Sequence, residues 1–243
     1  MISLVGKVLI VLEGVPGSGK TTYWQSLKEQ CETSHDPRSN KIVFIPEFFD
    51  WAKNRDQQTK EDVELSLKKQ YETLGEYPSF QFLVQLLTYQ MLCEFATRIN
   101  QAQIIIADRW FFSEILFRFA LGLQGDPVLY RQYDIFGTLL FGRSSKGYDP
   151  ARVLPQMFAF NMYATTTAVI TLPSDLAFER IKTRGRPEEE CITEDYVNLL
   201  SGLWREMIPT DPIKGLTFFF PENLDLPALS DLLDEVLAPK NEL

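Results

Sequence analysis

The sequence predicts an α/β fold in which helices cover both faces of a five-stranded parallel sheet. Five short apolar runs alternate with longer segments of helical character along the 243 residues. Parallel strands that are buried on both faces have such continuous apolar runs. Polar side chains follow the runs at their carboxyl ends, and in a doubly wound sheet this edge binds the ligand. We therefore expect one domain over residues 1–243, with its site at that edge.

The expected elements follow the chain in order. The strands are the apolar runs at 8–12, 42–45, 104–107, 168–172 and 216–220. Helical segments are expected at 21–30, 50–76, 80–100, 110–121, from 174 onward and at 227–238. We expect the second of these to be interrupted near Gly75. Glycine and proline punctuate about 122–163, which is expected to be an irregular insertion that forms a dimer surface or a lid over the substrate.

Composition limits the compartment and the partners. The formal net charge of −9 argues against a nucleic-acid duplex or an anionic membrane as main partner, because both bind basic surfaces. No apolar run reaches the ~18 residues of a membrane span, and no signal peptide is expected. Cys31, Cys93 and Cys191 are widely spaced and odd in number, which is typical of free thiols in a reducing compartment. We expect a cytoplasmic protein whose ligands are small molecules.

The first strand runs into a phosphate-binding loop. The stretch GVPGSGKT fits the pattern G-x-x-x-x-G-K-[ST] without mismatch, between a strand and the start of a helix. Glycines let backbone N–H groups point at an anion, and the helix dipole adds positive partial charge. Lys20 is expected to reach the β- and γ-phosphates of ATP, and the Thr21 hydroxyl to hold Mg²⁺. The residues expected to bind ATP in this loop are Gly14, Val15, Pro16, Gly17, Ser18, Gly19, Lys20, Thr21 and Thr22.

Charged residues follow the second and third strands. Glu47 comes just after the run 42–45, where a carboxylate is placed to accept the proton of an alcohol during phosphoryl transfer. A helix-capping glutamate is the alternative. Asp108 ends the third run and is expected to hold Mg²⁺ directly or through water, while Arg109 neutralises charge near the reacting hydroxyl. A simple salt pair between these two residues is the alternative.

Cations cluster at about 180–192 in a chain that is otherwise acidic. Arg180, Lys182, Arg184 and Arg186 come before three glutamates. One arginine side chain can bind two phosphate oxygens at once, and its charge stabilises the negative charge that develops in phosphoryl transfer. A helix that runs into an Arg-Gly-Arg-Pro loop is typical of a lid that closes over the triphosphate. A solvated helix end is the alternative.

Together these motifs resemble those of the deoxynucleoside kinases, a family that includes the related viral thymidine kinases. The resemblance covers about 14–118 and 165–205 and rests on GVPGSGKTT, Glu47, Phe80-Gln81, Asp108-Arg109 and RIKTRGRPEEE followed by Tyr196, Leu200 and Trp204. It implies a homodimer and transfer of the γ-phosphate of ATP to the 5′-hydroxyl of a deoxynucleoside. It also implies that Glu47 is the base, with Arg109 beside it, and that Arg180, Arg184 and Arg186 contact the phosphates. The apolar faces of 80–98 and 110–121 are candidates for the dimer contact.

The resemblance further implies which residues bind the nucleoside. Gln81 would hold the edge of the base through its amide. Glu189 would bind the sugar 3′-hydroxyl together with Tyr71, for which Tyr77 is the alternative. Glu114 would lie near the exocyclic group of the base.

Two positions depart from the family pattern. Phe48 stands where proline usually follows the catalytic glutamate, and Arg118 stands where an aromatic ring usually stacks on the base. The side-chain amide of Gln81 has an acceptor and a donor, and their positions exchange when the amide is turned over. It can therefore pair with the edge of thymine, cytosine or adenine. Glu114 favours an amino group, but Thr88 replaces the arginine that accompanies such an acid in cytosine-preferring members. We therefore expect pyrimidines to be accepted broadly.

Two other functions compete with this reading. A nucleoside monophosphate kinase of the thymidylate type needs another arginine near the second strand, and the sequence offers none before Arg55. A phosphate-loop protein that acts as a nucleotide-binding switch would not need Glu47, Gln81 and Glu189 together. Consumption of ATP with and without deoxynucleosides separates these possibilities.

Overall fold

The computed structural model describes residues 6–73, 78–110, 117, 120, 166–207, 216–219 and 226–237. Of residues 78, 79, 81, 82, 85, 166, 167, 205–207 and 216–219 it describes the backbone alone. The expected insertion at about 122–163 and most of the expected helix at 110–121 lie outside the described residues. The expectation of a single domain over 1–243 stays a prediction.

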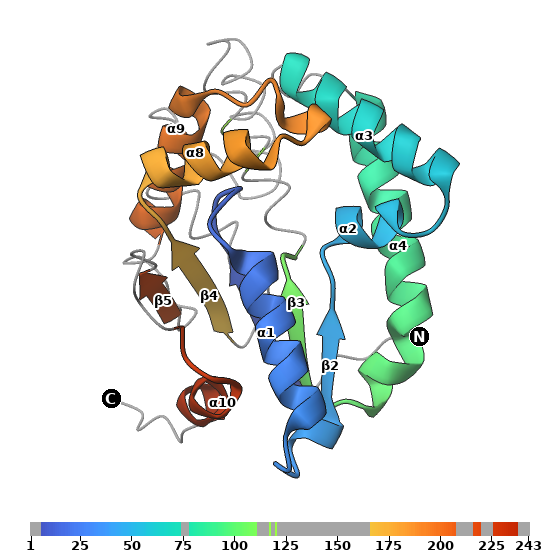
Figure 1. Cartoon of the computed structure of the whole chain (residues 1–243). Helices are drawn as coiled ribbons and strands as arrows, with labels where there is room; N and C mark the ends of the chain where they lie inside the picture. The colour runs from blue at the N-terminus through green and yellow to red at the C-terminus, as the bar shows by residue number, and fades with distance from the viewer. Residues whose placement is uncertain are drawn as a thin grey trace, which may run out of the picture.

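A five-stranded parallel sheet forms the centre of the fold, as the sequence predicts. The strands are β1 (Val8–Glu13), β2 (Ile42–Ile45), β3 (Ile104–Asp108), β4 (Thr166–Thr171) and β5 (Leu216–Phe219). Their order in the sheet is β2-β3-β1-β4-β5, and every neighbouring pair is parallel. The strand with the phosphate loop is therefore central, between β3 and β4. All carboxyl ends point the same way, so their loops share one edge (Figure 1).

Helices lie between the strands in sequence. They are α1 (Lys20–Thr33), α2 (Phe48–Lys53), α3 (Gln57–Glu72), α4 (Pro78–Gln101), α8 (Ser174–Arg184), α9 (Glu194–Met207) and α10 (Leu229–Leu237). Short 3₁₀ turns occur at η1 (Ser39–Lys41) and η2 (Pro187–Glu189). The expected single segment at 50–76 is instead two helices. Asp56 separates them, because its carboxylate accepts from the Thr59 backbone N–H at 2.7 Å and so begins α3.

Alternate residues of the strands bury opposite faces of the sheet. Ile10 and Leu12 of β1 pack with residues of α1 and α10. Leu9 and Val11 pack on the other face, in a core that includes Met91 of α4. This alternation is the pattern expected of strands covered on both sides. It confirms the predicted layering, with helices on both faces.

The carboxyl edge of the sheet is covered by α2, α3 and α8. Figure 1 shows these helices gathered beyond the arrowheads of the strands, with α1 starting beneath α8. In the part of the chain that the structure describes, no helix is long and apolar enough to cross a membrane. The three cysteines are free, and Cys93 and Cys191 are exposed. The site described below lies at this carboxyl edge.

Candidate active site

The phosphate loop is shaped by glycines that have no room for a side chain. Gly14 and Gly17 have φ angles of 143° and 80°, a region that L-residues rarely adopt. A methyl group at Gly14 would collide with the Ile170 carbonyl oxygen of β4. At Gly17 it would collide with the Ala177 carbonyl oxygen of α8. The loop is therefore packed tightly against both β4 and the helix that precedes the expected lid.

Lys20 begins α1 and is buried. Its ammonium donates a hydrogen bond to the Val15 carbonyl oxygen at 3.2 Å. Burial, followed by the neighbouring Arg109, lowers its pKa to about 8, against the opposing effect of nearby carboxylates. A buried cation that donates a hydrogen bond to a neutral carbonyl is suited to a phosphate group, which supplies negative charge.

Asp108 ends β3 with a carboxylate that is 1% exposed. Burial, followed by repulsion from Glu47, raises its pKa to about 6, while Lys20 and the Thr21 hydroxyl act in the opposite direction. Neither carboxylate oxygen has a hydrogen bond of good geometry within the described residues. Mg²⁺ prefers oxygen ligands, and this site offers two carboxylate oxygens of Asp108 beside the hydroxyl of Thr21. The residues predicted to hold Mg²⁺ therefore fit that ion.

Arg109 follows Asp108 and contacts the first residue of the phosphate loop. Its φ of 68° is the one positive value among the described residues other than glycine, which indicates backbone strain at this position. Its Nη1 donates to the Gly14 carbonyl oxygen at 3.0 Å, and its Nε lies 2.9 Å from Oε1 of Glu47. The guanidinium carbon lies 4.4 Å from the ring centroid of Phe117. These contacts hold the cation in one orientation.

Glu13 is a buried neighbour of Arg109 that the sequence analysis did not single out. It is fully buried at the end of β1, 3.7 Å from Nη1 of Arg109, and it accepts from the Trp110 backbone N–H at 3.3 Å. A carboxylate in an apolar core strand is costly unless it is paired. The glutamate at the end of the run VLIVLE was therefore a signal in the sequence.

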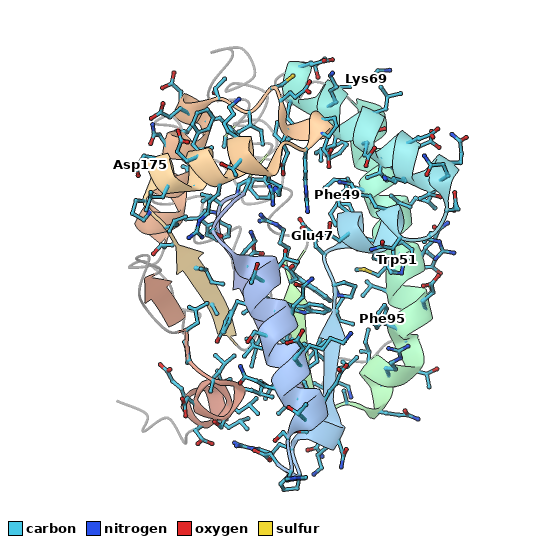
Figure 2. All side chains as sticks on the ribbon, viewed as in Figure 1. Glu47, Phe49, Trp51, Lys69, Phe95 and Asp175 are labelled. Carbon is cyan, nitrogen blue, oxygen red and sulfur yellow. The ribbon has the colours of Figure 1, made fainter. Side chains whose placement is uncertain are left out.

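Glu47 precedes α2 and faces the phosphate loop. Its backbone carbonyl accepts from Trp51 at 2.9 Å, but its carboxylate does not cap the helix. That carboxylate pairs instead with Arg109. Figure 2 shows Glu47 at the carboxyl end of β2, in the space below α8. This geometry disfavours the alternative of a helix-capping glutamate.

A cleft joins these residues to the expected lid. The residues that line it are Pro16, Gly17, Lys20, Thr21, Glu47, Phe49, Asp50, Lys53, Leu67, Gln70, Tyr71, Phe80, Arg109, Phe117, Arg184, Arg186, Glu188 and Glu189. The predicted catalytic residues Glu47, Lys20, Arg109 and Arg184 therefore share one cavity. We call Lys20, Glu47, Asp108 and Arg109 the strand-end cluster.

The end of α8 and the turn η2 form the segment expected to be a lid. Gly185 ends α8 in the left-handed conformation, and its N–H donates to Ile181 at 3.2 Å. Arg184 then turns back on Glu189 with two parallel contacts, Nε to Oε2 at 3.1 Å and Nη2 to Oε1 at 2.6 Å. The predicted phosphate ligand and the predicted sugar ligand thus satisfy one another in this structure. We call residues 184–189 the lid segment.

Two further ion pairs connect the lid segment to α2. Lys53 pairs with Glu188, whose side chain is 3% exposed. Arg186 lies 4.0 Å from Asp50. Although burial raises the pKa of Glu188, the Lys53 ammonium holds it below its usual value. Sequence reasoning missed both α2 partners, because nothing local indicates that α2 lies against a segment far along the chain.

The other predicted residues fall in three groups. Tyr71 lines the cleft, and its ring packs edge-on against Tyr196 with centroids 5.9 Å apart. Arg180 lies beside Gly19 but not in the wall of the cleft. The side chain of Gln81 lies outside the described part of the structure, as do Glu114, Tyr77 and Arg118.

Comparisons with known proteins were made for the sequence and for the structure. No protein-family model matches the chain. Among curated proteins, "Probable thymidylate kinase 1" of Saccharolobus solfataricus is 31% identical over 117 residues, which are 48% of this chain. The match spans about half of that relative, 53% of its length.

Solved structures match over almost the whole chain. A deoxyadenosine kinase from M. mycoides with bound dATP covers 94% of this chain and 98% of its own, with a TM-score of 0.52 and 18% identity. The same kinase with bound dCTP gives a TM-score of 0.47 and 19% identity over 95% of this chain. At such identity the first likeness establishes the fold. The chain therefore has the phosphate-loop kinase fold of a deoxyadenosine kinase, as its resemblance to the deoxynucleoside kinases predicts.

Proposed function

We propose that this protein is an ATP-dependent deoxynucleoside kinase that phosphorylates the 5′-hydroxyl, with pyrimidines such as thymidine and deoxycytidine favoured. The observation that carries the proposal is the pairing of Glu47 with Arg109 in the wall of one cleft that also contains Lys20. A switch protein needs the phosphate loop but no carboxylate aimed at it. An alcohol acceptor needs such a carboxylate.

In the proposed reaction each charged residue of the site has a separate role. Glu47 accepts the proton of the 5′-hydroxyl as that oxygen bonds to the γ-phosphorus and the bond from phosphorus to the β-phosphate oxygen breaks. Arg109 orients Glu47 through the 2.9 Å ion pair. Lys20 and Arg184 neutralise charge on the phosphates. Thr21 and Asp108 would hold Mg²⁺, which when bound offsets charge on the phosphate oxygens.

The lid segment adds phosphate contacts in this proposal. Binding of ATP would exchange the Arg184–Glu189 pair for contacts of Arg184 to phosphate, and Glu189 would then be released for the sugar hydroxyl. Arg180 and Arg186 join Arg184 around the triphosphate. Because the side chains of Arg184 and Arg186 are 35% and 37% exposed, their ion pairs are partly solvated and inexpensive to exchange.

The preference for pyrimidines rests on the sequence resemblance. Gln81 and Glu114, which the resemblance assigns to the base, lie outside the described side chains. Phe49 and Phe80 stack in the cleft wall with centroids 5.7 Å apart and provide an apolar surface suited to a base. The proposed homodimer likewise rests on the resemblance. Leu86 and Tyr89 of α4 are exposed within the segment expected to form its contact.

A monophosphate kinase of the thymidylate type is the second candidate. The curated relative favours it, and so does Lys53, a cleft cation that the sequence analysis did not consider and that lies in the same cleft as Arg186. Lys53 is already paired with the buried Glu188, and Arg186 is assigned above to the triphosphate, so neither cation is reserved for an acceptor phosphate. We therefore rank the deoxynucleoside kinase first.

One experiment separates the candidates. Purified full-length protein is supplied with ATP and Mg²⁺, and formation of ADP is followed with no acceptor, with four deoxynucleosides, and with the matching 5′-monophosphates. Mass spectrometry of the acceptor identifies the product. We expect ADP formation that depends on a deoxynucleoside and yields its 5′-monophosphate. Turnover with monophosphates alone, or the same rate without acceptor, would overturn the proposal.

A further inference from the structure

Glu13 places a fully buried carboxylate at the end of β1, a strand that is otherwise apolar. Nη1 of Arg109 lies 3.7 Å from its Oε2 atom, and its Oε1 atom accepts the backbone N–H of Trp110 at 3.3 Å. Burial removes the hydration of a carboxylate, and an apolar side chain at a buried ion pair is often as stable or more stable. Stability alone therefore does not explain a charge at this position, and its neighbour Arg109 indicates what the charge does.

Arg109 lies between two carboxylates that come from the strands on either side of its own. In the sheet, β3 lies between β2 and β1. Arg109 follows β3, whereas Glu47 follows β2 and Glu13 ends β1, so the order of the strands produces a row of carboxylate, guanidinium and carboxylate. Burial by itself lowers the pKa of Arg109, but Glu47 and then Glu13 act against it, and the pKa is raised above its usual value. Both carboxylates therefore act on the same cation.

The two sides of the guanidinium are held differently. On the β1 side, Nη1 also donates to the Gly14 carbonyl oxygen at 3.0 Å, and the backbone N–H of Arg109 donates to Leu12 at 3.0 Å. On the β2 side, Nε is 2.9 Å from Oε1 of Glu47, but this contact lacks the geometry of a hydrogen bond. It therefore attracts Glu47 by charge and does not tie a carboxylate oxygen into a directed bond.

We propose that Glu13 is a positioning residue, which holds Arg109 from the β1 side so that its Nε atom stays against Glu47 on the β2 side. This inference rests on the proposed function, in which Glu47 accepts the proton of the acceptor hydroxyl. Glu13 acts through Arg109, because within the described residues it does not belong to the wall of the cleft. Without the charge of Glu13, the guanidinium turns toward the remaining carboxylates, and Glu47 moves relative to the acceptor. A shift of ~1 Å in a catalytic group can cost about 100-fold in rate.

The variant Glu13→Gln tests this role, because the amide keeps the size of the side chain and an oxygen that can accept from the Trp110 N–H. Steady-state kinetics are measured with ATP and a deoxynucleoside, and the affinity for ATP is measured by calorimetry. We expect kcat to fall roughly 10- to 100-fold, with both KM values and the affinity for ATP within about twofold of the wild type. Thr171→Val, a change of similar size at the buried end of the neighbouring strand β4, is the matched control and should leave kcat unchanged.

A double-mutant cycle with Glu47→Gln separates positioning from a structural role. If Glu13 acts through Glu47, Glu13→Gln should cost less than about twofold in a protein that already lacks the Glu47 carboxylate. Support of the phosphate loop predicts instead the same loss in both backgrounds, together with weaker binding of ATP, and that pattern would overturn the inference.

Two further results would also count against the positioning role. They are a normal kcat in Glu13→Gln, and a Glu13→Gln protein that thermal unfolding shows to be unfolded at the assay temperature. The proposed function fails separately, if the wild type phosphorylates no deoxynucleoside.

Discussion

The strand-end cluster and the lid segment hold their charges in different ways. In the strand-end cluster, Asp108 and Lys20 are 1% and 5% exposed and sit at the ends of elements that the sheet positions. In the lid segment, the side chains of Arg184 and Arg186 are more than a third exposed and are paired with carboxylates. Burial lowers the pKa of Lys20 and raises that of Asp108, whereas ion pairs neutralise the arginines of the lid segment.

This difference separates two tasks in phosphoryl transfer. Charges fixed in a buried site need no reorganisation when the reacting groups change charge, which favours the chemical step. Charges on partly solvated pairs exchange partners easily, which favours binding and release of a charged ligand. We therefore expect changes in the strand-end cluster to lower kcat, and changes in the lid segment to act more on the KM for ATP.

Glu47→Gln should have the largest effect. The amide keeps the size of the side chain but cannot accept the proton of the hydroxyl, and loss of a general base typically costs ~10²–10⁴-fold in rate. We expect kcat to fall by this factor while ATP and nucleoside still bind, as measured by calorimetry. A rate within about threefold of the wild type would remove Glu47 from the mechanism.

Lys20→Ala and Arg184→Ala compare the two regions directly. Loss of a fixed charge near the transferred group costs ~10²–10³-fold in kcat, which we expect for Lys20→Ala. For Arg184→Ala we expect about a tenfold fall in kcat/KM, mainly through KM for ATP, because Arg184 is partly solvated. Lys182→Ala, an exposed cation on the same helix, is the control and should behave as the wild type. Normal kinetics at all ATP concentrations in Arg184→Ala would contradict the lid assignment.

The strand-end cluster was largely predictable from the sequence, and the reason is local. Glycines, Lys20 and Thr21 belong to a continuous motif, and Glu47 and Asp108 directly follow or end apolar strands. Parallel strands bring such ends to one edge wherever the strands lie in the sheet. The sheet itself was predictable for the same reason, since each strand is a separate apolar run.

Pairing across the cleft was not predictable in this way. The contacts of Lys53 with Glu188 and of Arg109 with Glu13 depend on how distant segments pack, which no spacing in the sequence encodes. Gln70 carries no local signal either, because its burial becomes apparent only when α3 covers the cleft. The break between α2 and α3 was not predicted, because Asp56 lies in a stretch rich in charged residues, where a capping carboxylate does not stand out.

The Lys53–Glu188 pair tests whether the lid segment is anchored to α2. Lys53→Met leaves a buried carboxylate without its partner and should lower the free energy of unfolding by about 1–3 kcal/mol. The double variant Lys53→Met with Glu188→Leu should cost less than the two single changes together. Denaturant unfolding of all four proteins gives the coupling energy. The exposed pair Lys68–Glu190 is the matched control, for which we expect a coupling below ~0.5 kcal/mol; equal coupling in both pairs would contradict the anchoring role.

Asp108→Asn should change stability in the opposite direction. The raised pKa of Asp108, about 6, means that folding disfavours its charged form. At pH 7.5 the wild type therefore carries a cost that asparagine lacks, and the variant should unfold at a higher temperature, by roughly 2–4 °C for each kcal/mol at this chain length.

This difference in unfolding temperature should depend on pH with a defined sign. As the pH falls below about 6, folded Asp108 takes up a proton, so the gap between the wild type and Asp108→Asn narrows. It closes below the unfolded-state pKa of about 3.9, where the carboxyl is neutral in both states. The variant, although more stable, should be the less active protein, because asparagine is a weaker ligand for Mg²⁺. At pH 7.5 it should need a higher Mg²⁺ concentration than the wild type for half-maximal rate. A destabilised variant with a normal Mg²⁺ requirement would mean that the buried carboxylate is structural and that the strand-end cluster holds its metal elsewhere.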